Sequence, residues 1–128
     1  MAIRVVRLGS PRLPGEGVRI GTVRRPPRGV PKAEFATRDY YDAWFPVLSP
    51  SAETVKLGLH AGSEKEWATF IRRFRREMSR PDATAALDLL AALSHVADFS
   101  IGCYCADEAG CHRSVLRELL VERGASMT

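Results

Sequence analysis

The feature that most restricts the fold is the closing segment, in which an apolar run leads through a short turn into a helix. Residues 99–105, FSIGCYC, have the length and apolar character of a buried strand. Residues 106–110, ADEAG, predict a turn, and residues 111–123, CHRSVLRELLVER, predict a helix that ends at Gly124. A strand–turn–helix unit of this kind is typical of an α/β domain.

Two further strands are predicted near the N-terminus. Residues 3–8 and 18–23 are short runs rich in β-branched residues. Residues 24–31, RRPPRGVP, contain consecutive prolines and three arginines, which predicts an irregular, basic loop. The aromatic segment 38–48 has no decisive periodicity, so both strand and irregular structure stay open for it, as does the role of residues 40–45.

Helix signals fill the middle of the chain. Ser51 is the expected cap of a short helix, and Ser63 with Glu66 forms an S-x-x-E capping box that opens a helix over 64–78. The apolar residues of this helix recur with helical spacing and predict one buried stripe. They are Trp67, Phe70, Ile71, Phe74 and Met78. We therefore expect this helix to pack with one face against the core.

A further helix, rich in alanine and leucine, is predicted over 83–97, with Asp82 as its cap after Pro81. In chain order the elements are two strands, three helices, one strand and a final helix. This order predicts a small single α/β domain over 1–128, with a short, mostly parallel sheet packed by helices and a strand–turn–helix site near the C-terminus. A length of 128 residues suits one domain.

Composition narrows the location and the partners. The hydrophobic fraction of 45% and the charged fraction of 27% are those of an ordinary globular protein. No run of about 18 apolar residues exists, and the first residues lack the apolar core of a signal peptide. We therefore expect a cytoplasmic protein with no membrane contact and with reduced thiols. The net charge of +4 permits an anionic partner without requiring one.

All three cysteines lie close together, at Cys103, Cys105 and Cys111, and His112 follows the last of them. Three thiols and one imidazole suit tetrahedral zinc. The spacing C-x-C-x5-C-H is nevertheless uncommon for zinc, and adjacent helical residues point about 100° apart. A metal site on these four residues is therefore not favoured, and core packing of the first two cysteines is the alternative.

The start of the last helix is also a candidate anion site. A helix N-terminus presents free N–H groups and a partial positive charge, and here it carries Cys111, His112, Arg113 and Ser114. It follows the carboxyl end of a strand, where ligands bind in α/β folds. The helix end and the neighbouring cations favour the thiolate form of Cys111. Cys111 and His112 are thus the expected reactive groups, as nucleophile or general acid/base.

The segment CYCADEAGCHRSVLRELL resembles the closing segment of the DUF488 family (domain of unknown function 488). The segments IRVVRL, GVRIGTVRRPPRG and LSPSAETVKLGLHAGSEKEWATFIRRFRREM resemble the short, YeaO-like branch of that family. The matching positions are Arg19, Arg24, Pro27, Arg28, Gly29, Pro50, Ser51, His60, Cys111, His112, Arg113 and Ser114. The chain departs from the branch at Val23, where an aspartate is usual, and at Pro26, where a tryptophan is usual.

The resemblance implies an α/β domain but supplies no reaction, no cofactor and no oligomeric state. It implies a site in which Arg24, Arg28 and His60 lie near Arg113 and Ser114, provided that both strands end on the same edge of the sheet. Arginine forks suit a phosphate or a carboxylate. The leading hypothesis is therefore an enzyme-like domain that binds a small anionic ligand, bearing a phosphate or a nucleotide, at the Cys-His-Arg-Ser helix start.

Two other functions stay open. One is a metal-binding or thiol-redox module that uses the cysteine and histidine cluster. The other is a nucleic-acid-binding accessory protein that uses the basic face of the helix over 64–78. The arginines of that face are Arg72, Arg73, Arg75 and Arg76. Such a face contacts phosphates in some proteins and is simply solvated in many others.

Overall fold

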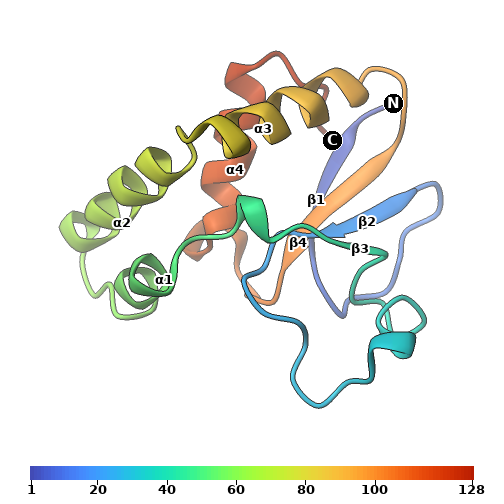
Figure 1. The fold of residues 1–128 in the computed structure, drawn as a ribbon, viewed down its shortest axis with the longest axis horizontal. Helices are drawn as coiled ribbons and strands as arrows, with labels where there is room; N and C mark the ends of the chain where they lie inside the picture. Colours follow the sequence, from blue (N-terminus) through green and yellow to red (C-terminus); the bar gives the residue numbers. More distant parts are fainter.

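The computed structural model describes residues 1–128 and contains one sheet of four parallel strands (Figure 1). The strands are β1 (Ile3–Arg7), β2 (Val18–Gly21), β3 (Ala43–Trp44) and β4 (Phe99–Cys103). They lie in the order β1-β4-β2-β3, so the last strand of the chain is inserted between the first two. Ile101 of β4 pairs with Val5 on one side and with Ile20 on the other. The prediction of a small α/β domain with a short parallel sheet is confirmed.

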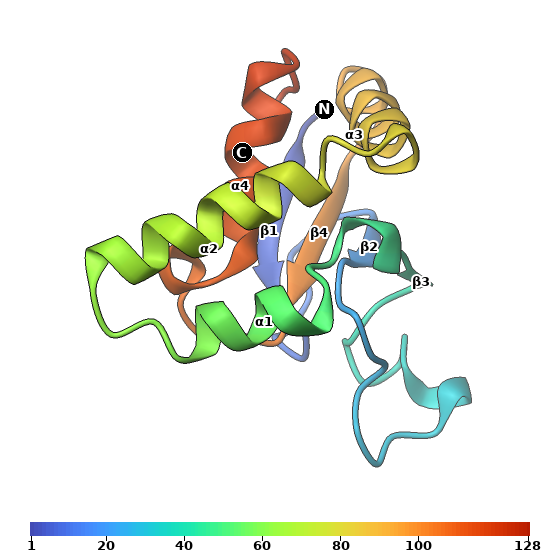
Figure 2. The ribbon, with the colours of Figure 1, turned by 60° about the vertical axis from the view of Figure 1, so that its left-hand side comes forward.

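Four helices connect and follow these strands. They are α1 (Ala52–Leu59), α2 (Glu64–Glu77), α3 (Pro81–Leu93) and α4 (His112–Glu122). The chain also forms three short 3-10 helices, η1 (Lys32–Glu34), η2 (Pro46–Leu48) and η3 (Glu108–Gly110). Figure 2 shows α2 crossing in front of β1 and β4, with α4 and α3 on either side. None of the helices is both long enough and apolar enough to cross a membrane.

The two serine caps predicted from the sequence are present. The Ser51 hydroxyl accepts the backbone N–H of Thr54 at the start of α1, and the Ser63 hydroxyl accepts that of Glu66 at the start of α2. Each bond satisfies a donor that the first helical turn leaves free. These local bonds fix where both helices begin.

The predicted start and end of the third helix are wrong. The helix α3 begins at Pro81, with Arg80 as its N-cap, and it ends at Leu93 rather than at residue 97. Proline suits the first helical position because its missing N–H has no partner there in any case. Asp82 therefore lies inside the first turn, where its carboxylate accepts the N–H of Ala83.

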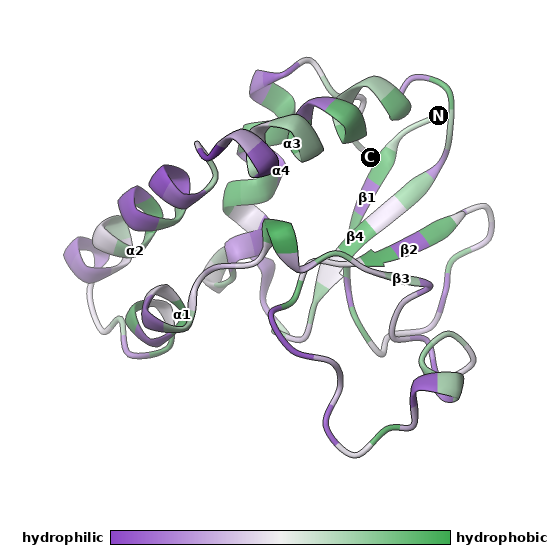
Figure 3. Cartoon of the chain, viewed as in Figure 1, coloured by the Kyte–Doolittle hydropathy of each residue, from purple (hydrophilic) through white to green (hydrophobic).

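One face of the sheet packs on the helices. Ile3, Phe99 and Ile101 meet buried side chains of α2, α3 and α4, such as Phe74 and Leu116. In the predicted stripe of α2, the residues Phe70, Phe74 and Met78 are buried, whereas Trp67 and Ile71 are half-buried. Hydrophilic and hydrophobic stretches accordingly alternate along α2 in Figure 3. The amphipathic pattern of this helix thus directs it onto the sheet.

The other face of the sheet is covered by loop segments and carries a buried ion pair. Arg19 and Ser100 are register partners on β2 and β4, and both contact the carboxylate of Glu16. Tyr41, from the aromatic segment, packs against Gly21 so closely that a Cβ there would clash with its ring. The segment that stayed open in the sequence is mostly irregular and contributes β3 and η2.

Candidate functional site

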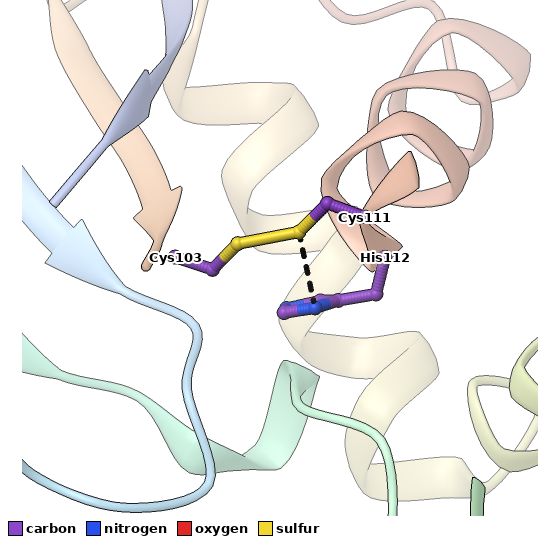
Figure 4. A group of neighbouring side chains, drawn as sticks. All are labelled: Cys103, Cys111 and His112. Atoms are coloured by element: carbon purple, nitrogen blue, oxygen red, sulfur yellow. Dashed lines mark hydrogen bonds between the residues drawn. A yellow bond between two sulfur atoms is a disulfide. The ribbon is translucent and has the colours of Figure 1, made fainter. Parts of the chain in front are cut away.

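Two cysteine sulfurs meet where β4 ends and α4 begins. Cys103 is the last residue of β4, and Cys111 is the N-cap of α4. Their sulfurs are joined in a disulfide, as Figure 4 shows, and both side chains are buried. Cys105 is free and half-buried. The expectation of three reduced thiols is therefore wrong for two of them.

His112 lies beside this sulfur pair, with its ring anchored through one nitrogen and its other nitrogen in contact with the sulfur of Cys111. Its Nε2 atom is 2.7 Å from the backbone carbonyl oxygen of Thr22, and its Nδ1 atom is 3.7 Å from the sulfur of Cys111. A carbonyl oxygen only accepts hydrogen bonds, so Nε2 carries the ring proton and donates it. The lone pair of Nδ1 is then directed at Cys111 (Figure 4).

Burial keeps this imidazole neutral. Loss of solvent lowers the pKa of His112 to about 4, the bond to the Thr22 carbonyl partly opposes that change, and the charge of Arg113 adds to it. The ring of Phe74 packs edge-on against the imidazole at a centroid distance of 5.6 Å. At neutral pH, His112 is consequently a base with a free lone pair rather than a cation.

The side chains of Cys111 and His112 lie close together, although adjacent residues of a helix were expected to point about 100° apart. Cys111 has extended backbone angles, φ −132° and ψ 153°, because it precedes the first helical residue. Its side chain therefore does not follow the 100° step of a helix. The ligand atoms of Cys103, Cys111 and His112 all lie within 4.8 Å of one another, and Cys105 does not belong to this group. Of the four residues considered as metal ligands from the sequence, where a metal site was not favoured, three lie together.

A small hollow adjoins the cluster. It has a volume of about 60 Å³ and is lined by Cys111 and His112, with apolar side chains from α1 and α2 opposite them, among them Leu59 and Trp67. Cys105 lies on its wall as well. Pockets that enclose whole ligands usually measure about 300–1,000 Å³. The hollow therefore admits a small group, or one end of a larger molecule.

Arg113 is buried without a counter-charge. Its side chain is 3% exposed, its Nη2 donates to the carbonyl oxygen of Cys105 at 2.6 Å, and its Nε has no partner. No carboxylate lies within ion-pair distance of Arg113. The nearby Glu108 pairs with Arg117 instead, at 2.7 Å. Burial lowers the pKa of Arg113. Most buried charges in proteins are paired, so this one is unusual.

The other residues expected to bind an anion do not share one hollow with the cluster. Arg24 and Arg28 are exposed, and Arg28 lines a separate hollow of about 370 Å³. His60 is exposed at the C-cap of α1 and lines another hollow of about 250 Å³. The hydroxyl of Ser114 donates to the carbonyl oxygen of Cys111. Only Arg113 and Ser114 lie next to the cysteine cluster.

The basic face of α2 is partly neutralised. Arg73 pairs with Glu53, and Arg75 pairs with Glu118 and Glu122 of α4. Arg72 and Arg76 have no carboxylate partner. Two free arginines on this face are a small electrostatic footprint for a nucleic acid.

Thr22 is the functional residue that sequence reasoning missed. It follows β2, and its carbonyl oxygen orients His112 although the two residues are 90 positions apart. Its hydroxyl donates to the carbonyl oxygen of Gly102 on β4. The only sequence signal was its place near the end of the strand predicted over 18–23.

Comparison with known proteins identifies the family. A family model described as the active DUF488-N3 subclade matches residues 3–124. No curated protein and no solved structure matches the chain. Because the family model spans nearly the whole sequence, the chain belongs to the DUF488 family.

Proposed function

We propose that this chain is a thiol-dependent, enzyme-like domain in which Cys111 is the nucleophile and His112 its base. Cys103 is the second thiol, which closes a reversible disulfide with Cys111. The observation that carries the proposal is the convergence of the two sulfurs and the imidazole within 4.8 Å. The description of the matched subclade as active also supports an enzyme.

The chemistry is thiol–disulfide exchange. In the reduced protein, Nδ1 of His112 takes the thiol proton of Cys111 only as the sulfur attacks one sulfur of a substrate disulfide, and it passes that proton on, so the imidazole is neutral before and after the step. The substrate's other sulfur leaves as a thiolate and takes up the proton. Cys103 then attacks the Cys111 sulfur of the mixed disulfide, which releases the second substrate thiol and leaves the Cys103–Cys111 disulfide. The substrate is reduced by two electrons, and the protein is oxidised by two.

The hollow supports a restricted substrate class. Cys111 is 2% exposed, so a reactant reaches it through a space of about 60 Å³. The opposite wall is apolar, which favours the low-charge end of the substrate over a phosphate. A low-molecular-weight disulfide that inserts one sulfur meets these conditions.

The test measures single-turnover reduction of a small disulfide by pre-reduced, metal-free protein and compares the rate of wild type with the rates of variants. The Cys111→Ser variant is expected to lose the reaction, and the matched control Cys105→Ser is expected to keep it. His112→Gln is expected to slow the reaction about 100-fold, because it removes the base. Equal rates for wild type and Cys111→Ser would reject the proposal.

A second candidate is binding of a small anion at the start of α4. It is supported by Arg113, whose buried guanidinium has no carboxylate partner and an unpartnered Nε. Backbone N–H groups at a helix start add favourable dipoles for an anion. Phosphate, or a nucleotide that carries one, is then expected to raise the melting temperature of wild type but not of Arg113→Met. An equal rise in both would exclude Arg113 as the binding group.

A further inference from the structure

We propose that the reduced form of this cluster binds a zinc-type divalent cation through Sγ of Cys103, Sγ of Cys111 and Nδ1 of His112. The inference rests on the dithiol of the proposed function and adds a ligand class to the same site. Two thiolates and one imidazole are the donors that zinc prefers in proteins.

One ligand distance already fits a tetrahedral ion, and reduction of the disulfide frees the two sulfurs to move apart to the same spacing. With metal–sulfur bonds of about 2.3 Å and metal–nitrogen bonds of about 2.0–2.1 Å, tetrahedral ligand atoms lie roughly 3.5–3.8 Å apart. The sulfur of Cys111 and Nδ1 of His112 are 3.7 Å apart, and all three ligand atoms lie within 4.8 Å of one another. The Cα atoms of Cys103 and Cys111 are 7.9 Å apart. Two thiolates on one ion span that separation.

The outer contacts of His112 also match those of a metal ligand. A ligating histidine almost always donates its other ring N–H to a carboxylate, a carbonyl or water, which fixes the tautomer and the ring orientation. Here Nε2 donates to the Thr22 carbonyl oxygen at 2.7 Å. Thr22, which accepts the hydrogen bond of His112, follows β2, and the metal ligand Cys103 ends β4. These two strands are neighbours in the sheet and hold both residues in place.

Charge and access favour a divalent ion with an open position. Two buried thiolates are costly alone, whereas two thiolates with one divalent cation are neutral together. Three protein ligands leave a fourth position for water or substrate, as in catalytic zinc sites. The hollow that Cys111 and His112 line provides space for that fourth ligand.

Metal binding and disulfide formation exclude each other at this site. A phosphine or dithiol reductant must first supply two electrons and two protons to the Cys103–Cys111 disulfide. The cation then displaces the two thiol protons and binds both thiolates. Oxidation by a disulfide substrate reverses the sequence and releases the ion.

The first experiment uses the full chain, reduced with a phosphine, stripped with a chelator and titrated with Co²⁺. We expect thiolate-to-metal charge-transfer absorption that saturates at one ion per chain and is abolished by added Zn²⁺. Absence of this absorption from reduced wild type overturns the inference.

The second experiment maps alkylation of the three cysteines by peptide mass spectrometry, with and without Zn²⁺. We expect the ion to slow alkylation of Cys103 and Cys111 at least about 10-fold, because metal-bound thiolates are poor nucleophiles for the reagent. Cys105 serves as the internal control and should change less than about 2-fold, because its thiol is outside the cluster. Protection of Cys105 instead would overturn the assignment, and this result does not depend on whether any variant folds.

Variants then separate the metal site from the proposed reaction. Cys105→Ser should keep the charge-transfer absorption, whereas Cys103→Ser and His112→Gln should lose it or bind Co²⁺ at least about 10-fold more weakly. If wild type exchanges disulfides in its metal-free form but shows no charge-transfer absorption when Co²⁺ is added, the metal inference fails and the proposed function stands. If it binds the ion but exchanges no disulfide, the metal site stands and the proposed function fails.

Discussion

Two arginines are almost completely buried in this protein, and they differ in what surrounds them. Arg19 is 0% exposed, and Glu16 receives two hydrogen bonds from it, at 2.7 and 2.9 Å. Its Nη1 also donates to the carbonyl oxygens of Ser10 and Asp39. Arg113 is 3% exposed and makes one hydrogen bond, to a carbonyl oxygen.

The comparison separates a structural charge from a functional candidate. The guanidinium of Arg19 ties the covering loops to β2, and its charge is matched within the fold. Arg113 lies beside the cysteine cluster, and its charge is not matched there. Both residues match the family pattern, so a motif match alone does not distinguish the two roles. The partners of each side chain do.

The largest expected effect comes from removing the paired arginine. Arg19→Met leaves Glu16 as a lone buried carboxylate and is expected to lower the free energy of unfolding by about 3–5 kcal/mol. Arg113→Met removes a charge that had no partner, so its effect should stay within about 1 kcal/mol. Urea denaturation of both variants at pH 7 measures the difference. Equal losses would show that the two arginines have the same structural role.

Acid is expected to weaken the ion pair of Arg19 by protonating its partner Glu16. Burial raises the pKa of Glu16, but hydrogen bonds from Arg19, Ser100 and the Leu13 N–H outweigh it and lower the pKa to about 2. Because the folded pKa lies below the unfolded value of 4.5, the stabilisation is full above pH 4.5 and is lost as the pH falls towards 2. The loss is expected to reach about 3 kcal/mol.

Denaturation midpoints between pH 5 and pH 2 measure this effect. Glu16→Gln should be less stable at pH 7 but should show a flatter dependence in that range. Arg113→Met should keep most of the dependence of wild type, because Arg113 forms no ion pair and only adds to the larger effect of Arg117 on the pKa of Glu108. A flattened profile in Arg113→Met would contradict the comparison.

Smaller effects than that of Arg19→Met are expected from the two serines near these arginines. Ser100 donates to the buried carboxylate of Glu16 at 2.7 Å, so Ser100→Ala is expected to cost about 1.5–3 kcal/mol. Ser114 donates to the Cys111 carbonyl oxygen at 2.9 Å, a neutral acceptor, and Ser114→Ala is expected to cost about 0.5–1.5 kcal/mol. Thermal unfolding of the two variants at pH 7 gives the ranking, and the reverse order would show that the Glu16 cluster is not the stronger network.

Part of the candidate site was predictable from residue types and spacing. Cys111 and His112 were expected at a helix start after a buried strand, and they lie there. Cys105 belongs to the strand predicted over 99–105, but β4 ends at Cys103 and leaves Cys105 in the following loop. The end of a strand depends on its neighbours: pairing with β1 stops at Cys103, and pairing with β2 stops one residue earlier.

The sequence by itself determined the elements whose signals are local. These signals act within a few residues, so they can be recognised in the sequence. They are the caps at Ser51 and Ser63, the apolar spacing of α2 and the glycine after α4. Tertiary structure alone decided that β4 lies between β1 and β2, that the Thr22 carbonyl meets His112, and that Arg19 is paired while Arg113 is not. These contacts join segments as far as 96 positions apart, where chain packing and not local preference sets the partner.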